Sequence, residues 1–238
     1  MLGAVKRFRS HSTWVVLALL AVAAPSVRQA AGSSTPKFDF YLLSMSLHAA
    51  FCADHAGKPE CRARGQRPLV IHGLWPENLT PRTYPHDCPA PPLKLDPFLE
   101  QQLGEFMPGM ADGLHVHEWR EHGGCAGLDD DVYFARTLEL ARALDAALAA
   151  KLTTLEGRET SPGELRGTAD LFRPGIAATF TLHCRTTRES GGQPVLVEIR
   201  QCVDNDGPSG APGTLLQCVK MKRRDQGCGS RFLIARRQ

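Results

Sequence analysis

The spacing of apolar residues predicts strands near both ends of the main domain. From Phe38 to Leu47 the side chains alternate between the two faces of an extended chain, as they do in a strand. The apolar run Leu69–Ile71 leads directly into His72 and predicts a short, buried strand. Further strand-like runs follow in the second half of the chain, at Ile176–Cys184, Val195–Cys202, Leu215–Val219 and Phe232–Ile234.

Helical spacing dominates the middle of the chain. Asp96 is a suitable N-cap, and Pro97 a suitable first residue, for a helix that Pro108 ends. A longer helix is predicted from Asp131 to Leu155, because apolar residues recur there every three or four positions. These residues are Phe134, Leu138, Ala141, Leu144, Leu148 and Leu152. Ser161–Glu164 has the spacing of a capping box and predicts the start of another helix.

The order of these elements defines the expected fold class. Residues 76–97 are rich in proline and polar side chains and are expected to form a long loop. Helices in the middle, with strands before and after them, predict an α+β fold. We expect a central, mainly antiparallel sheet that packs with several helices.

The first thirty residues have the layout of a secretory signal peptide. Basic residues at Lys6, Arg7 and Arg9 precede an uncharged apolar run from Trp14 to Ala24. This run is shorter than the roughly 20 apolar residues that span a bilayer, so a tethering helix is the less favoured alternative. We expect a signal peptide over residues 1–31, a single domain over residues 32–238, and a periplasmic or extracellular location without membrane attachment.

Removal of the leader changes the charge of the protein. The whole chain has 28 basic and 25 acidic residues, which gives a formal net charge of +3. Four of the basic residues and none of the acidic ones lie in residues 1–31, so the mature domain has a net charge of about −1. Overall charge therefore gives no argument for nucleic-acid binding, and any such contact must come from a local site.

Eight cysteines follow the leader: Cys52, Cys61, Cys88, Cys125, Cys184, Cys202, Cys218 and Cys228. An even number of cysteines behind a secretory leader indicates four disulfides formed in an oxidising compartment. Eight cysteines allow 105 pairings, so spacing alone leaves the connectivity open. A zinc site is the alternative, but the chain has no Cys-x-x-Cys pair.

Candidate chemistry is concentrated in two short segments, 71–76 and 115–125. In a helix, Glu118 and His122 would share a face, and a carboxylate beside an imidazole forms an acid–base pair. The zinc-protease motif His-Glu-x-x-His does not fit, because His117 and His122 are five positions apart, about 140° around an α-helix, and the motif needs histidines four apart. In the first segment Trp75 offers a flat face for base stacking close to His72, although either residue alone is more typical of a core.

Taken together, the two segments resemble the active-site motifs of the ribonuclease T(2) family. The first is His-Gly-Leu-Trp-Pro at 72–76, and the second is His-Glu-Trp-x-x-His-Gly-x-Cys at 117–125. The resemblance extends from about Phe38 onward, through the segment before Cys52, the segment 127–134 and the cysteine-bearing tail. The presence of both motifs, in the order in which the family has them, is highly specific for that family.

The resemblance implies an endoribonuclease that cleaves single-stranded RNA without a metal or another cofactor. In this family the ribose 2′-hydroxyl attacks the adjacent phosphorus and forms a 2′,3′-cyclic phosphate. Water then opens the cyclic phosphate to a 3′-phosphate. DNA has no 2′-hydroxyl, so no DNA cleavage is expected. We also expect the protein to be a monomer.

The family's residue roles can be carried over to matching positions. The resemblance implies that His122 is the general base and His72 the general acid for the leaving 5′-oxygen. His117 is expected to bind phosphate, and Glu118 to polarise the phosphoryl group or orient its neighbours.

The resemblance also implies base contacts and a disulfide pattern. Trp75, Glu77 and Tyr84 are the expected base-binding residues. The implied disulfides are Cys52–Cys61, Cys88–Cys125, Cys184–Cys228 and Cys202–Cys218.

One departure from the family pattern concerns catalysis. Glu121 stands where the family usually has a lysine that stabilises negative charge on phosphorus, and Gly124 replaces the usual threonine. On α-helical geometry Arg120 projects about 200° away from Glu118 and is a poor substitute. Two hypotheses remain. The first is an active enzyme that works best at acid pH, because neighbouring carboxylates raise each other's pKa. The second is a catalytically weakened ribonuclease fold that binds RNA or a partner. A disulfide-rich binding protein unrelated to RNA would require both motifs to be coincidental.

Overall fold

The computed structural model describes residues 37–62, 67–80, 83–186 and 190–237. The predicted signal peptide lies outside the described residues. In the part of the chain that is described, no helix is both long and apolar enough to cross a membrane.

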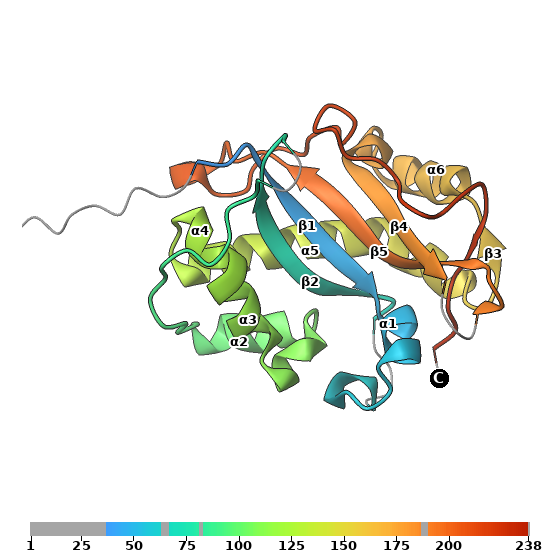
Figure 1. Cartoon of the computed structure of the whole chain (residues 1–238), viewed down its shortest axis with the longest axis horizontal. Helices are drawn as coiled ribbons and strands as arrows, with labels where there is room; N and C mark the ends of the chain where they lie inside the picture. The colour runs from blue at the N-terminus through green and yellow to red at the C-terminus, as the bar shows by residue number, and fades with distance from the viewer. Residues whose placement is uncertain (1–36, 63–66, 81–82, 187–189, 238) are drawn as a thin grey trace, which may run out of the picture. The chain divides into compact units, whose positions relative to one another are not determined.

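The centre of the fold is a sheet of mainly antiparallel strands, as predicted (Figure 1). Its main strands are β1 (Phe40–Leu47), β2 (Leu69–Glu77), β4 (Phe180–Thr186) and β5 (Pro194–Val203). β1 pairs with β2 on one side and with β5 on the other, and β4 pairs with β5. The short β6 (Phe232–Leu233) adds a parallel contact to β5, and β3 (Glu159–Thr160) pairs with β6.

Helices lie against one face of this sheet and beyond its edges (Figure 1). They are α1 (His48–Asp54), α2 (Pro97–Gly104), α3 (Leu114–Glu118), α4 (Gly124–Ala126), α5 (Asp130–Thr154) and α6 (Pro162–Phe172). Between α3 and α4 lies one π-helical turn, Trp119–Gly123. The 3-10 turns are Pro59–Cys61, Pro108–Asp112, Ile176–Thr179 and Pro208–Gly210. The α+β class expected from the sequence is thus confirmed.

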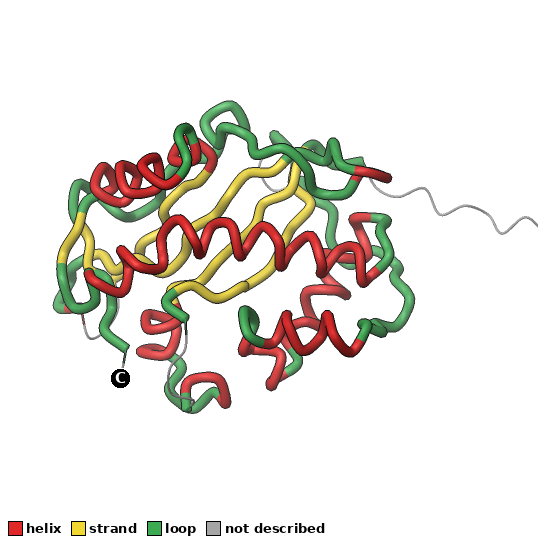
Figure 2. Tube along the Cα trace, turned by 180° about the vertical axis from the view of Figure 1, so that it is seen from behind, coloured by secondary structure: helices red, strands yellow, loops and turns green. Residues whose placement is uncertain are grey.

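The two faces of the sheet differ in character. The long helix α5 crosses one face (Figure 2), where Leu43 and Ile199 of the sheet join Leu144 and Leu148 of the helix in one buried cluster. Side chains of cross-strand partners share a face. On the second face, Ser46, Glu198 and His183 are successive partners across β1, β5 and β4. This second face therefore carries a row of polar groups.

The predicted strand at Leu215–Val219 was wrong. Leu215 makes a single isolated bridge to Val203, and the residues after it form turns. The Cys202–Cys218 disulfide pulls this segment inward at one end, while Val219 remains exposed. Leu215 and Leu216 are only half-buried, and Cys218 is the buried residue of this segment, which forms no strand ladder.

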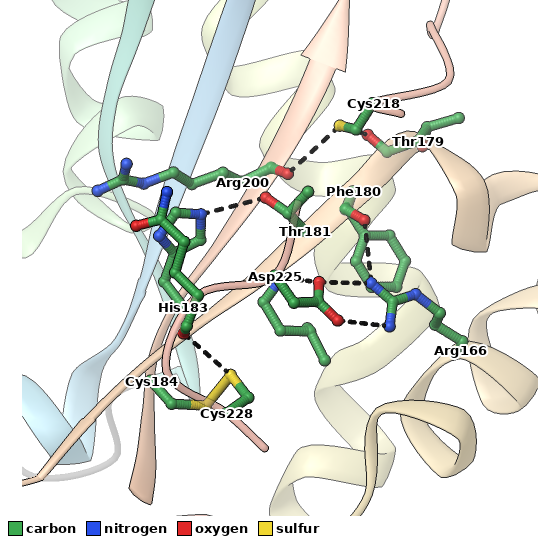
Figure 3. A network of polar contacts seen from close by, with 12 residues as sticks. Arg166, Thr179, Phe180, Thr181, His183, Cys184, Arg200, Cys218, Asp225 and Cys228 are labelled. Atoms are coloured by element: carbon green, nitrogen blue, oxygen red, sulfur yellow. Dashed lines mark hydrogen bonds and ion pairs between the residues drawn. A yellow bond between two sulfur atoms is a disulfide. The ribbon is translucent and has the colours of Figure 1, made fainter. Parts of the chain in front are cut away.

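Four disulfides tie the fold together, in the pairs expected above: Cys52–Cys61, Cys88–Cys125, Cys184–Cys228 and Cys202–Cys218. Figure 3 shows how the C-terminal segment is held against β4. Asp225 accepts hydrogen bonds from both Nη atoms of Arg166, at 2.9 and 2.7 Å, and from the backbone N–H of Leu182 at 2.9 Å. The Cys88–Cys125 disulfide attaches the long loop after β2 to α4.

Candidate active site

His72 is the extra residue of a β-bulge in β2. Gly73 lies opposite Ser44 and Ile71 lies opposite Met45, so His72 has no partner of its own on β1. A bulge bends a strand and redirects one side chain. The His72 side chain remains 38% exposed, although both of its neighbours in the strand are buried.

Glu198 of β5 determines how His72 is held. Its Oε1 lies 2.7 Å from His72 Nδ1, and its Oε2 accepts hydrogen bonds from Nε and Nη2 of Arg200 at 2.8 and 2.5 Å. Burial alone would lower the pKa of His72, but the hydrogen bond and the charge of Glu198 raise it overall. Burial would raise the pKa of Glu198, but His72 and Arg200 lower it to about 2. The arrangement favours a protonated His72 beside an ionised Glu198.

Glu118 reaches the same place from α3. Trp75 Nε1 donates a hydrogen bond of 2.8 Å to Glu118 Oε2, and Glu118 Oε1 lies 3.9 Å from His72 Nε2. A Cβ atom at Gly73 would lie 2.0 Å from Glu118 Oε2, so only glycine permits this approach. Burial raises the pKa of Glu118, and Glu121 adds a smaller effect in the same direction.

The π-helical turn corrects the α-helical geometry assumed for residues 115–125. The backbone bonds of a π-helix join residues five apart, so the angle of 140° between His117 and His122, which assumed an α-helix throughout, does not apply across this turn. Trp119 is the first residue of this turn, and a Cβ at Gly123 would lie 2.3 Å from its ring. A Cβ at Gly124 would lie 2.7 Å from the carbonyl oxygen of Cys88. Glycine at 124 thus permits close packing of the loop on the helix.

His122 differs electrostatically from His72. Burial, followed by the positive charges of His117 and His72, lowers the pKa of His122 to about 4. Its Nδ1 is buried and has no hydrogen-bond partner among the described residues. The ring centroid of His122 lies 5.5 Å from that of Trp75, which in turn lies 5.2 Å from that of His72. Two imidazoles with opposite pKa displacements therefore flank one indole ring.

The other predicted site residues occupy different positions. His117 is exposed and lies in α3, immediately before Glu118. Tyr84 is 41% exposed, and its ring centroid lies 6.4 Å from that of His122. Glu77 instead forms an ion pair with Arg223, and burial raises its pKa against the opposing charge of Arg223. The structure thus brings His72, Trp75, Glu118 and His122 together, with Tyr84 at the edge and Glu77 engaged elsewhere.

Sequence analysis missed Glu198 and Arg200. Both lie in the predicted strand Val195–Cys202, where two charged residues at alternate positions must share a face. That pattern was the signal in the sequence that could have identified the two residues. It does not indicate which histidine the pair contacts, because the pairing depends on the order of the strands.

A fold with these two motifs can be placed in a known class. Residues 38–211 match the model of the Ribonuclease T2 family. The chain therefore belongs to this family. Membership supports an RNA endoribonuclease, a hydrolase, as its activity.

Individual relatives agree in sequence and fold. The chain is 24% identical over 204 residues to extracellular ribonuclease LE of Solanum lycopersicum, covering 76% of this chain and 80% of the relative. It is 23% identical over 185 residues to ribonuclease I of Escherichia coli K12, covering 62% of this chain and 69% of the relative. The crystal structure of a ribonuclease MC1 mutant matches with a TM-score of 0.63 at 23% identity, covering 82% of this chain and 100% of that chain.

Proposed function

We propose that this protein cleaves single-stranded RNA by metal-independent transphosphorylation, through a 2′,3′-cyclic phosphate to a 3′-phosphate. The observation that carries the proposal is that the pKa values of two imidazoles beside Trp75 are shifted in opposite directions. The pKa of His72 is raised, and the pKa of His122 is lowered to about 4. Acid and base roles at one pH require titratable groups whose surroundings move their pKa values apart.

The roles follow from these protonation states. Neutral His122 takes the proton of the ribose 2′-hydroxyl as its oxygen attacks phosphorus. Protonated His72 gives its proton to the departing 5′-oxygen, and Glu198 stabilises the imidazolium form. In the second step His72 takes a proton from water, and His122 returns one to the 2′-oxygen. Glu118, fixed by Trp75, faces the phosphoryl group.

The neighbouring surfaces suit a nucleotide. A cavity of about 350 Å³ adjoins His72 and Glu198, within the roughly 300–1,000 Å³ typical of ligand pockets. It can receive the nucleoside that carries the leaving oxygen. Trp75 and Tyr84 offer rings for the base of the nucleotide that supplies the 2′-hydroxyl. His117 offers an imidazole for phosphate. Mutants of ribonuclease MC1 have been crystallised with 5′-UMP and 5′-GMP, which supports nucleotides as the ligand class.

Location and assembly are part of the same proposal. The relative named extracellular ribonuclease LE and the four disulfides support secretion, after removal of a leader over residues 1–31. The secreted form is proposed to be a monomeric domain.

A second candidate is an RNA- or partner-binding protein with weakened turnover. Glu121 favours it, because a carboxylate near the reacting phosphorus opposes the charge that develops there. The backbone carbonyl of Glu121 accepts a hydrogen bond from Asp87 N–H at 2.9 Å, so the loop also packs on this residue.

Product analysis separates the two candidates. The purified, oxidised chain is incubated in EDTA with single-stranded RNA or with DNA of the same sequence. The proposed enzyme yields 2′,3′-cyclic ends from RNA and leaves DNA intact, and His122→Ala abolishes the products. RNA binding without any cleavage would support the second candidate.

A further inference from the structure

A buried carboxylate stands in the wall of the cavity beside His72. Glu60 lies in the 3-10 turn Pro59–Cys61 and is only 8% exposed. Its Oε2 is buried, and no described residue forms a hydrogen bond with it. A buried carboxylate oxygen without a donor is costly. Such a group is explained if a ligand supplies the missing donor.

The surroundings hold Glu60 in place. The Cys52–Cys61 disulfide joins α1 to the 3-10 turn beside Glu60. The rest of the cavity wall combines apolar side chains, among them Val70, Val197 and Leu114, with polar ones, among them Ser46, His48 and Arg185. Of the two carboxylates in this wall, Glu198 is already bonded to His72 and Arg200, so Glu60 is the one that can accept hydrogen bonds from a base.

We propose that Glu60 selects guanine in the nucleotide that carries the leaving 5′-oxygen. This inference rests on the proposed function, which places that nucleotide in the cavity beside His72. An ionised carboxylate only accepts hydrogen bonds, and it accepts two parallel ones well. Guanine alone among the RNA bases presents two adjacent N–H donors, N1–H and the N2 amino group, on its Watson–Crick edge.

The other bases fit this carboxylate less well. Adenine and cytosine set one amino group beside an acceptor nitrogen, and uracil sets its single N3–H between two carbonyls. Each of these arrangements places an acceptor against a carboxylate oxygen. A good bidentate contact discriminates between bases by about tenfold or more.

Dinucleotides with one variable base test the proposal. UpG, UpA, UpC and UpU share the nucleoside that supplies the 2′-hydroxyl and differ only in the leaving one. We expect kcat/KM for UpG to exceed that for UpU by about tenfold or more. Glu60→Gln should lose about tenfold on UpG and change little on UpU. Equal rates on all four substrates, or an equal loss on all four in the variant, would overturn the proposal.

Two controls separate recognition from folding and from catalysis. Glu105→Gln removes an exposed carboxylate at the end of α2 and should leave the base preference unchanged. Hydrolysis of 2′,3′-cyclic UMP has no leaving nucleoside, so Glu60→Gln should retain it if the variant is folded. If the wild type cleaves neither the dinucleotides nor 2′,3′-cyclic UMP, the proposed function fails. Calorimetry with guanosine then decides whether the guanine site exists. Guanosine binding that Glu60→Gln abolishes supports the site, and equal or absent binding by both proteins excludes it.

Discussion

His72 Nδ1 lies 2.7 Å from Oε1 of Glu198, and the same carboxylate is held from its other side by Arg200. A carboxylate bonded to one ring nitrogen fixes the orientation of the imidazole and leaves the other nitrogen to act on substrate. Here that free nitrogen, Nε2, is the one that lies 3.9 Å from Glu118. Glu198 is therefore a positioning residue for the proposed acid.

The first prediction concerns Glu198→Gln. Because Glu198 raises the pKa of His72, its neutralisation should lower that pKa and shift the basic limb of the pH–rate profile to lower pH. The rate near pH 7 should fall by about tenfold, while the acid limb stays in place. Glu105→Gln is the matched control. A uniform loss at every pH would show that Glu198 is only structural.

The second prediction concerns the contact between Gly73 and Glu118. Gly73→Ala should force Glu118 from its bond with Trp75, because the added Cβ would lie 2.0 Å from Oε2. We expect a loss of about 1–3 kcal/mol in the free energy of unfolding and at least a tenfold loss of activity. Gly167→Ala, in α6 with nothing within 4 Å of the new Cβ, should be neutral or stabilising. Equal behaviour of the two variants in urea unfolding and in RNA cleavage would contradict this geometry.

The third prediction addresses the departure at Glu121. Glu121→Lys removes a negative charge and supplies a positive one near the phosphorus, so kcat should rise by about tenfold or more. Glu105→Lys makes the same change of charge at an exposed site distant in sequence and should have little effect. An unchanged or lower kcat in Glu121→Lys would mean that Glu121 does not limit turnover.

The fourth prediction concerns stability at acid pH. His183 of β4 is 9% exposed, and burial, followed by the charge of Arg200, lowers its pKa to about 4. Since the unfolded histidine titrates near 6.5, the unfolded state binds more protons between these values. Stability should therefore fall as the pH drops from about 6.5 to 4, by on the order of 3 kcal/mol from this residue.

His183→Gln tests that origin. Glutamine can still bond the Thr181 hydroxyl, whose oxygen lies 3.2 Å from His183 Nε2, but it does not ionise. Thermal unfolding at pH 7, 5 and 4 should show a smaller acid loss for the variant than for the wild type. Parallel loss in both proteins would assign the effect to other groups, such as His122.

Some of the site could be predicted from the sequence because its parts are local. The motif at 72–76 lies within β2, and Glu118 and His122 lie in α3 and the π-helical turn directly after it, so their spacing along the chain indicated the chemistry. The α+β class and the mainly antiparallel sheet followed from the alternation of side chains along the strands and from the order of helices and strands. Each of these inferences depends on neighbours along the chain.

The remaining features depend on contacts between distant segments. The bulge at His72 exists only in the register of β1 against β2, and the Glu198 contact requires β5 to lie beside β1. The π-helical turn places one extra residue within the second motif, and α-helical geometry does not foresee it. Leu215–Val219 has the composition of a strand, but a disulfide and isolated contacts determine its path.

The pH dependence of kcat/KM in EDTA tests the two-histidine account most directly. With UpG or another dinucleotide as substrate, the account predicts a bell-shaped profile. The acid limb should lie near pH 4, where His122 becomes protonated, and the basic limb above pH 6.5, where His72 loses its proton. A flat profile from pH 4 to 8, or activity that disappears with EDTA, would contradict it.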